Sequence, residues 1–453
     1  MSAVDGLISG MDTSAVIRQL MQLERQPVVR LQSRKTTADR AITALQNLNT
    51  KFLALADLAR KLHTTSGWSR VQTTSSHADL LRATAADGTA PTSLTFRVGA
   101  VAAAHQIYSA ATYASADTQV AQSGRTITVS YTDEQGAAQS LVVDNHDGTL
   151  QSIATALNTA EGSPITARVV KTSDAGNYRL ELTAKRTGAS SAFTVTGIRQ
   201  PPSPEMAFSV ASQASDAQLL FGSSATPMTI SSSTNTFTGV APGLTLDVLK
   251  AEPGTTVTVS ITRDGASLGG DVEKLVAAAN EILRDLKTAT GFDPATKRGG
   301  ALRGNTSVRD LQNAVLTAVA SAVGGVSAAG AGLELTRDGT LKFDRAVFDK
   351  AYAADPAAVA ALFSGGDGIA TRLKSLSEGA TKYGTGTLTS AIELRRNEIR
   401  RIDDAIAGWD VRLAVKEKRL RAQFAALETA LGNAQQQSNW LAGQLASLPK
   451  INP

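Results

Sequence analysis

The sequence predicts an α+β protein in which helices at the two ends of the chain pair as a coiled-coil leg. Antiparallel β-rich head domains and a helical-plus-hairpin domain are expected between these ends. At both ends, apolar residues recur at alternating spacings of three and four, which is typical of helices that pack against another helix. Between residues 73 and 261 the apolar period changes to two, which is typical of antiparallel strands with one face in solvent.

The N-terminal leg is predicted from one apolar stripe and one proline. The stripe consists of Ala38, Ala41, Leu45, Leu48, Phe52, Leu55, Ala59 and Leu62. Upstream, Asp12 or Thr13 is expected to cap a shorter helix, and Pro27 should end or kink that helix near Gln26. We therefore expect a flexible leg segment at 1–37 and the N-terminal leg helix within 38–72.

The C-terminal leg is predicted from a matching stripe within residues 391–453. It comprises Ile399, Ile402, Ile406, Trp409, Leu413, Phe424, Leu427, Leu431, Trp440 and Leu441. Lys416 or Glu417 would fall on this seam, which indicates a local shift of register. Each seam needs a partner, and the nearest partner for each is the other, so we expect the two legs to pack together.

The middle of the chain is predicted to form β-rich head domains. Strands are expected around Ile127–Tyr131, Tyr178–Leu182 and Val257–Ile261, with one helix at Leu150–Asn158. The run Pro201-Pro202-Ser203-Pro204 does not suit a central strand, so it divides the region into head domains at 73–200 and 201–270.

Residues 271–390 are predicted to be a helical-plus-hairpin domain. Helices are expected at Asp271–Lys287 and Ser307–Val323. Leu333–Leu335 and Leu341–Phe343 flank Asp338-Gly339, which predicts a hairpin with a left-handed turn.

Composition and motifs give no sign of catalytic, metal or nucleotide chemistry. The four histidines are scattered, and cysteine is absent. The glycines at 299–304 have the spacing of a phosphate loop, but Asn305 stands where its lysine would be, so we expect Asn305 or Thr306 to cap the next helix. We predict a non-enzyme without catalytic residues, cofactor or metal site.

The charge balance argues against a nucleic-acid partner, and no segment predicts membrane insertion. Against 45 basic residues stand 40 acidic ones, a surplus too small and too dispersed for a phosphate-binding surface. The long uncharged stretch Leu311–Leu333 is interrupted by polar residues and a glycine pair. Met1–Gly10 lack the basic and apolar regions of a cleavable signal peptide.

Short motifs near both ends resemble the flagellar filament cap family, also called FliD or hook-associated protein 2. The N-terminal motif residues are Ser9, Gly10, Met11, Asp12, Leu20, Met21, Glu24, Arg25 and Pro27. Near the C-terminus, Phe424, Leu427-Glu428, the run Gln435-Gln436-Gln437 and Asn439-Trp440-Leu441 are similar to the family's closing motif. Asp338-Gly339-Thr340-Leu341 and Pro242-Gly243-Leu244 extend the resemblance to the interior.

The resemblance implies a structural protein rather than an enzyme. Members of this family cap the distal tip of the filament as a ring of several copies, where arriving flagellin folds and inserts. By the same resemblance, the partners are further copies of this chain, flagellin, hook-filament junction proteins and an export chaperone at the C-terminal segment. It also implies a secreted protein, exported through the flagellar type III pathway by an uncleaved signal within 1–37.

Three alternatives remain open at the level of sequence. Another flagellar axial protein, such as a junction protein or flagellin, would also pair helical termini around a β-rich middle. A β-rich surface adhesin that binds glycans would use the head alone. An unrecognised hydrolase is the third, although scattered polar residues give hydrolysis no site.

Overall fold

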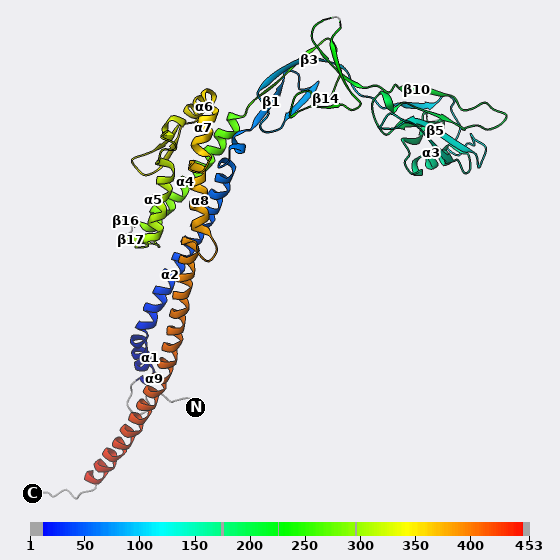
Figure 1. The fold of residues 1–453 in the computed structure, drawn as a ribbon. Coiled ribbons are helices and arrows are strands. Elements are labelled where there is room, and N and C mark those ends of the chain that lie inside the picture. Colours follow the sequence, from blue (N-terminus) through cyan, green and yellow to red (C-terminus); the bar gives the residue numbers. More distant parts are fainter. Residues whose placement is uncertain (1–11, 174–175, 225, 295–296, 447–453) are drawn as a thin grey trace, which may run out of the picture. The chain divides into compact units, whose positions relative to one another are not determined.

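The structure, a computed structural model, describes residues 12–173, 176–224, 226–294 and 297–446 (Figure 1). The chain divides into two compact units. A helical unit takes the residues up to Gly67 and those from Gly265 onward, and a β unit takes Trp68–Asp264. The predicted α+β class, with long terminal helices and antiparallel sheets, is confirmed.

The helical unit consists of eight helices and two small hairpins among its described residues. The helices are α1 (Thr13–Glu24), α2 (Gln26–Leu62), α4 (Gly265–Thr290), α5 (Thr306–Ala320), α6 (Arg345–Ala354), α7 (Pro356–Phe363), α8 (Ile369–Thr381) and α9 (Thr387–Ala446). The hairpins pair β16 (Phe292–Asp293) with β17 (Arg298–Gly299), and β18 (Leu333–Leu335) with β19 (Leu341–Phe343).

Local signals set most of these boundaries. The Asp12 carboxylate accepts the Ala15 N–H at 2.7 Å and caps α1, while Pro27 stands in the first turn of α2, where its missing N–H costs nothing. Asn305 caps α5 by accepting the Val308 N–H. Gly339 takes φ +75° in the β18–β19 turn, as the Asp-Gly pair predicted.

The apolar stripe of α2 is the centre of the helical unit. Its predicted positions from Ala38 to Leu62 are all buried, with exposed fractions of 3% or less. Along α2, Lys35 pairs with Asp403 of α9 at 2.6 Å, and Lys51 with Asp285 of α4 at 2.8 Å. The stripe therefore packs on three helices, α9, α4 and α8, and not on the C-terminal leg alone.

This packing differs from the predicted domain boundaries 38–72, 271–390 and 391–453. Helix α2 starts at Gln26, α4 starts at Gly265 and α9 starts at Thr387. The predicted helical-plus-hairpin domain and the upper part of the leg share one core, because α4 and α8 cover the stripe of α2. Periodicity revealed that the stripe is buried, but it carries no information about which helix covers it.

Hydrogen bonds across the helical unit hold its smaller elements. The Asn280 amide in α4 donates to the Leu341 carbonyl and accepts the Leu341 N–H, both at 2.7 Å, so it pairs with β19 as a neighbouring strand would. The Arg372 guanidinium in α8 donates to the Ser321 and Ala322 carbonyls beyond the end of α5. Its pairing with Asp367 lowers the pKa of that carboxyl.

The β unit contains two lobes, each with its own core. In the first, a five-stranded sheet has the order β1 (Val71–Ser75), β15 (Thr256–Arg263), β3 (Thr92–Ala100), β11 (Ala217–Phe221) and β12 (Met228–Ser232). A three-stranded sheet has the order β13 (Thr236–Thr238), β14 (Leu244–Val248) and β2 (Leu81–Ala85). Side chains such as Phe96, Leu219, Leu246 and Val259 fill the core of this lobe.

The second lobe packs one helix with two further antiparallel sheets. One sheet has the order β10 (Phe208–Ser212), β4 (Gln106–Ser109), β8 (Tyr178–Ala184) and β7 (Ile165–Lys171). The other has the order β6 (Ala138–Asp144), β5 (Thr126–Thr132) and β9 (Phe193–Thr196). Helix α3 (Leu150–Thr159) starts at a capping box of Thr149 and Ser152, and buries Leu150, Ile153 and Leu157.

The expected division into head domains 73–200 and 201–270 does not match the strand pairing. In the first lobe β1 pairs with β15, and β3 pairs with both β15 and β11, so strands from both sides of the boundary share a sheet. The second lobe is an insertion between β3 and β11. Pro201 and Pro202 lie between β9 and β10 of that insertion, so the proline run marks a connection inside it and no domain junction.

Replacing Leu55 by Ala should cost the helical unit about 2–5 kcal/mol of unfolding free energy, because this fully buried side chain would leave a cavity in the stripe of α2. Leu53→Ala is the matched control on the same helix, since Leu53 is 47% exposed. Urea unfolding followed by circular dichroism measures both. Equal losses for the two variants would contradict the placement of the stripe.

Candidate functional site

In the leg, helices α1 and α2 run antiparallel to α9, and two ion pairs show how the helices are aligned. Glu24 pairs with Lys416 at 2.6 Å, and Lys35 pairs with Asp403 at 2.6 Å, so numbers rise in one partner as they fall in the other. The hydrogen bond from Lys35 to Asp403 raises the pKa of the lysine. Exposed pairs of this kind contribute little to stability, so they mark an alignment that apolar burial sets.

A cluster of apolar side chains, called the lower-leg cluster below, joins α1 and the start of α2 to α9. Ile17 and Met21 of α1, Val28 of α2 and Leu413 of α9 are buried together. Partly buried Ile406, Trp409, Leu420 and Phe424 of α9 pack around them. The Arg412 guanidinium lies 5.3 Å from the Trp409 ring centroid and covers the outer side of that indole.

The structure separates the predicted seam residues into three groups. Leu45, Leu48, Phe52, Leu55 and Leu62 are buried in α2, as are Ile402 and Leu413 in α9. Ile399, Ile406, Trp409 and Phe424 are half-buried. Leu427, Leu431, Trp440 and Leu441 are exposed by 45%, 38%, 65% and 54%.

The exposed group lies where α9 continues past α1. Thr13, at the start of α1, lines the same groove as Phe424 and Glu428, so α1 begins opposite this level of α9. Leu427 lies at this level and Leu431 lies beyond it, and both continue the seam from Phe424 with the same three-four spacing. Trp440 lies on another face, because 13 residues from Leu427 turn a helix by about 220°. Residues 429–446 carry no charged side chain.

The residues of the N-terminal family motif gather at the corner between α1 and α2. Met21 is buried, Glu24 pairs with Lys416, and Arg25 is the single residue between the two helices. Asp12 caps α1 and Pro27 starts α2, whereas Leu20 is 41% exposed. Ser9, Gly10 and Met11 lie outside the described residues. The described motif residues thus help to hold the turn between α1 and α2.

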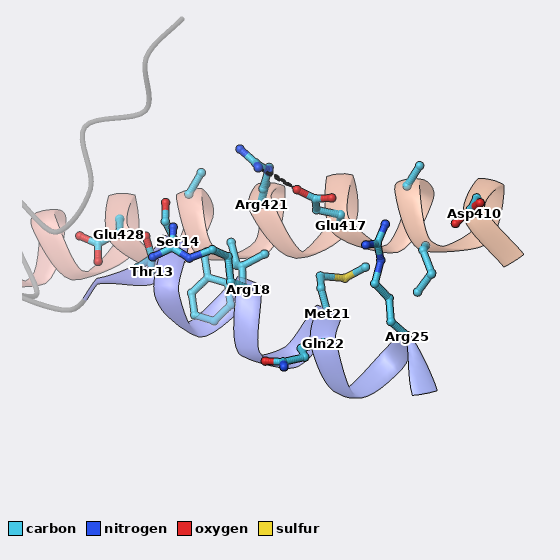
Figure 2. Close-up of a pocket in the computed structure, with 15 residues that line it drawn as sticks. Thr13, Ser14, Arg18, Met21, Gln22, Arg25, Asp410, Glu417, Arg421 and Glu428 are labelled. Carbon is cyan, nitrogen blue, oxygen red and sulfur yellow. Dashed lines mark hydrogen bonds and ion pairs between the residues drawn. The ribbon is translucent and has the colours of Figure 1, made fainter. Parts of the chain in front are cut away.

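A groove of about 990 Å³ follows α1 and α9 (Figure 2). Ile17, Met21, Leu413 and Phe424 form its apolar floor. Its rim carries both signs of charge: Arg18, Arg25 and Arg421, and Asp410, Glu417 and Glu428. Arg421 donates to Glu417 at 2.7 Å across one helical turn. An apolar floor between charged rims suits a protein side chain or helix better than a small metabolite.

Ile17 and Val28 take part in this site but were not on the predicted seam. The break at Arg25 interrupts the helix, so the phase of the α2 stripe does not extend to α1. The four-residue spacing of Ile17 and Met21 is the signal that would have identified the buried face of α1.

The described residues contain no cluster of three or more His, Asp or Glu that could hold a metal ion. His105 is packed edge-on against Phe193, its Nδ1 accepts the Phe193 N–H at 3.1 Å, and burial lowers its pKa. That imidazole therefore has a structural role. No helix within the described parts of the chain is both long and apolar enough to cross a membrane.

Comparisons with known proteins agree on one family. The family model "Flagellar hook-associated protein 2 N-terminus" matches residues 9–105, and "Flagellar hook-associated protein 2 C-terminus" matches residues 214–436. These matches leave out residues 106–213, which hold the second lobe of the β unit.

Relatives and a solved structure cover most of the chain. The A-type flagellar hook-associated protein 2 of Pseudomonas aeruginosa is 26% identical over 99% of this chain and 98% of its own. The B-type flagellar hook-associated protein 2 of Pseudomonas aeruginosa strain PAO1 is also 26% identical, over 97% of this chain and 94% of its own. The crystal structure of the D1-D2-D3 domains of the flagellar cap protein FliD from Escherichia coli has a TM-score of 0.60 at 21% identity. It covers 78% of this chain and 99% of that one, and it supports the fold.

The double variant Ile17→Asp/Met21→Asp should release α1 from α9, because both side chains are buried in the lower-leg cluster. Trypsin cleavage after Arg18 and Arg25 should become at least about tenfold faster, which needs only ~1.4 kcal/mol of easier local opening. Leu23→Asp, at a position 69% exposed on the same helix, is the control. The same acceleration in the control would count against this contact.

Proposed function

The chain belongs to the flagellar hook-associated protein 2 family, and from that membership we propose that it caps the distal tip of the bacterial flagellar filament. Its work there would be structural: it would retain exported flagellin at the tip and promote its folding and insertion. The observation that carries this proposal is the C-terminal part of α9, where apolar side chains are exposed to solvent and residues 429–446 carry no charge.

The leg supplies the reach and the surface that such a role needs. Helix α9 has 60 residues, which is about 90 Å of helix. Leu427 and Leu431 continue the seam at and beyond the start of α1, and they remain about two-fifths exposed. In a monomer this apolar stripe is exposed to water, which costs free energy. Packing against neighbouring helices would remove that cost, so the helical ends of filament subunits are suitable partners.

The proposed mechanism is steric and interfacial. Leg helices inserted among filament subunits would anchor the cap, while the β unit would form part of a plate above the site of insertion. Flagellin arriving beneath that plate would fold in a confined space that is closed to loss. No step forms or breaks a covalent bond, so the proposal requires neither catalytic residues nor a cofactor.

The finer assignments rest on the family. We propose a ring of several copies, contacts with flagellin and with hook-filament junction proteins, and an export chaperone at the C-terminal segment. The proposed location is outside the cell at the filament tip, reached by export without cleavage. A junction protein or another axial protein would explain the leg equally well, and the matches to both terminal family models favour the cap.

Deleting the gene should leave cells that export flagellin but lose it to the medium as monomer, with filaments absent or very short. Leu427→Asp/Leu431→Asp should fold and be exported, yet fail to restore swimming, because it places two charges on the unpaired part of the seam. Soft-agar motility and an immunoblot of flagellin in the supernatant measure both effects.

Thr429→Asp/Asn433→Asp is the matched control for this variant. It adds the same two charges at the same spacing and two residues further along α9, about half a turn away from the seam. It should swim normally. Normal filaments in the deletion strain would refute the cap assignment, whereas normal swimming by the Leu427→Asp/Leu431→Asp variant would refute only the role of this part of the leg.

A further inference from the structure

Strand β12 is an open edge of the five-stranded sheet. Among the strands that the structure describes it pairs only with β11, in a regular register from Ala217↔Ser232 to Phe221↔Met228. The outer side of an edge strand presents backbone N–H and C=O groups that another strand can pair with. Proteins usually protect such edges with charged residues, bulges, short strands or a covering segment.

Three other edge strands in the described part of the β unit, β10, β1 and β6, carry such protection. The pairing of β10 with β4 contains a bulge between Val210 and Ser212. Strand β1 lies against β2, where the Thr73 hydroxyl donates to the Ala83 carbonyl. Strand β6 ends on Asp144 and follows Asp133 and Glu134, which places acidic groups at both of its ends.

Strand β12 has neither a charged residue nor a bulge. The sequence from Ala217 to Leu246 contains no charged residue, although 19% of the whole chain is charged. The β11–β12 register has no bulge, and Met228 is 62% exposed. The free part of the edge is limited to the strand itself, because the Thr187 hydroxyl donates to the Ser233 carbonyl at 2.7 Å just beyond it.

We propose that β12 pairs antiparallel with β12 of a second copy of this chain, centred on Ile230. In that register Ile230 faces Ile230 of the second copy, and Met228 faces Ser232 of the second copy. Ile230 packs on the core of the first lobe, and on that face it would gain the Ile230 side chain of the second copy directly opposite. The exposed Met228 would gain the same isoleucine as a diagonal neighbour.

The opposite face is also self-complementary. There Thr229 faces Ser231 of the second copy, and hydroxyl pairs of this kind are favourable across strands. A two-fold axis through Ile230 makes both contacts twice, as in any isologous interface. Since the segment is uncharged, this self-pairing brings no like charges together. Five residue pairs bury less than ~1,200 Å², so the contact should be weak and concentration-dependent.

This contact does not depend on the proposed function, because it follows from the sheet edge and not from the leg. It can be tested in the full chain, which has no native cysteine to form competing disulfides. Ile230→Cys should give a disulfide-linked dimer under mild oxidation, since paired residues have Cβ atoms about 4.5–5.5 Å apart. Thr229→Cys mixed with Ser231→Cys should also cross-link, whereas Thr229→Cys alone should do so slowly.

Thr262→Cys is the control for random collision, because Thr262 is exposed on β15, which has a neighbour on both sides. Adding Thr229→Lys/Ser231→Lys to Ile230→Cys should reduce the cross-linking rate at least tenfold, since lysines would face lysines. Mixing that variant with Thr229→Glu/Ser231→Glu/Ile230→Cys should restore the rate.

Two results would overturn the proposal. One is an Ile230→Cys rate no higher than that of Thr262→Cys, which would mean that the edge does not pair. The other is equal cross-linking of the Thr229, Ile230 and Ser231 cysteine variants by themselves, which would indicate parallel pairing or collision.

Discussion

The burial of one apolar stripe on α2 determines the arrangement of the helical unit. The stripe is continuous from Ala38 to Leu62, and α9, α4 and α8 cover it together. Three helices can cover one continuous apolar face only if each of them covers a part of it. The single-residue break at Arg25 then lets α1 lie along α9, where Ile17 and Met21 find their own cover.

Sequence periodicity predicted local structure well, because side-chain direction follows directly from helix and strand geometry. It identified the buried face of α2, the hairpin at Asp338-Gly339 and the cap at Asn305. It did not identify partners. The packing of α2 on α4 and α8, and the pairing of β1 with β15, join segments that lie far apart in the chain, and a local period does not specify such contacts.

The same distinction applies to the candidate site. The seam positions of α9 were predicted from the sequence, but their division into buried Leu413 and exposed Leu427 was not. Exposure there depends on where α1 begins on the neighbouring helix, which is a property of the assembled leg. The apolar character of Leu427 and Leu431 was visible in the sequence, whereas their exposure beside the described part of α1 was visible only in the structure.

The packing of α2 on α9, marked by the pair of Lys35 and Asp403, also limits the order in which the chain can fold. These residues are 368 positions apart, so the leg closes only when the last part of the chain is available. The β unit is one continuous segment, and its strands pair among themselves without either terminus. If the chain becomes available from its N-terminus onward, the β unit can therefore fold before α4, α8 and α9 are present to cover α2. During that interval the apolar stripe of α2 is exposed to water and can associate with helices of other molecules. A leg with this topology therefore folds with less risk of association when its C-terminal residues become available quickly.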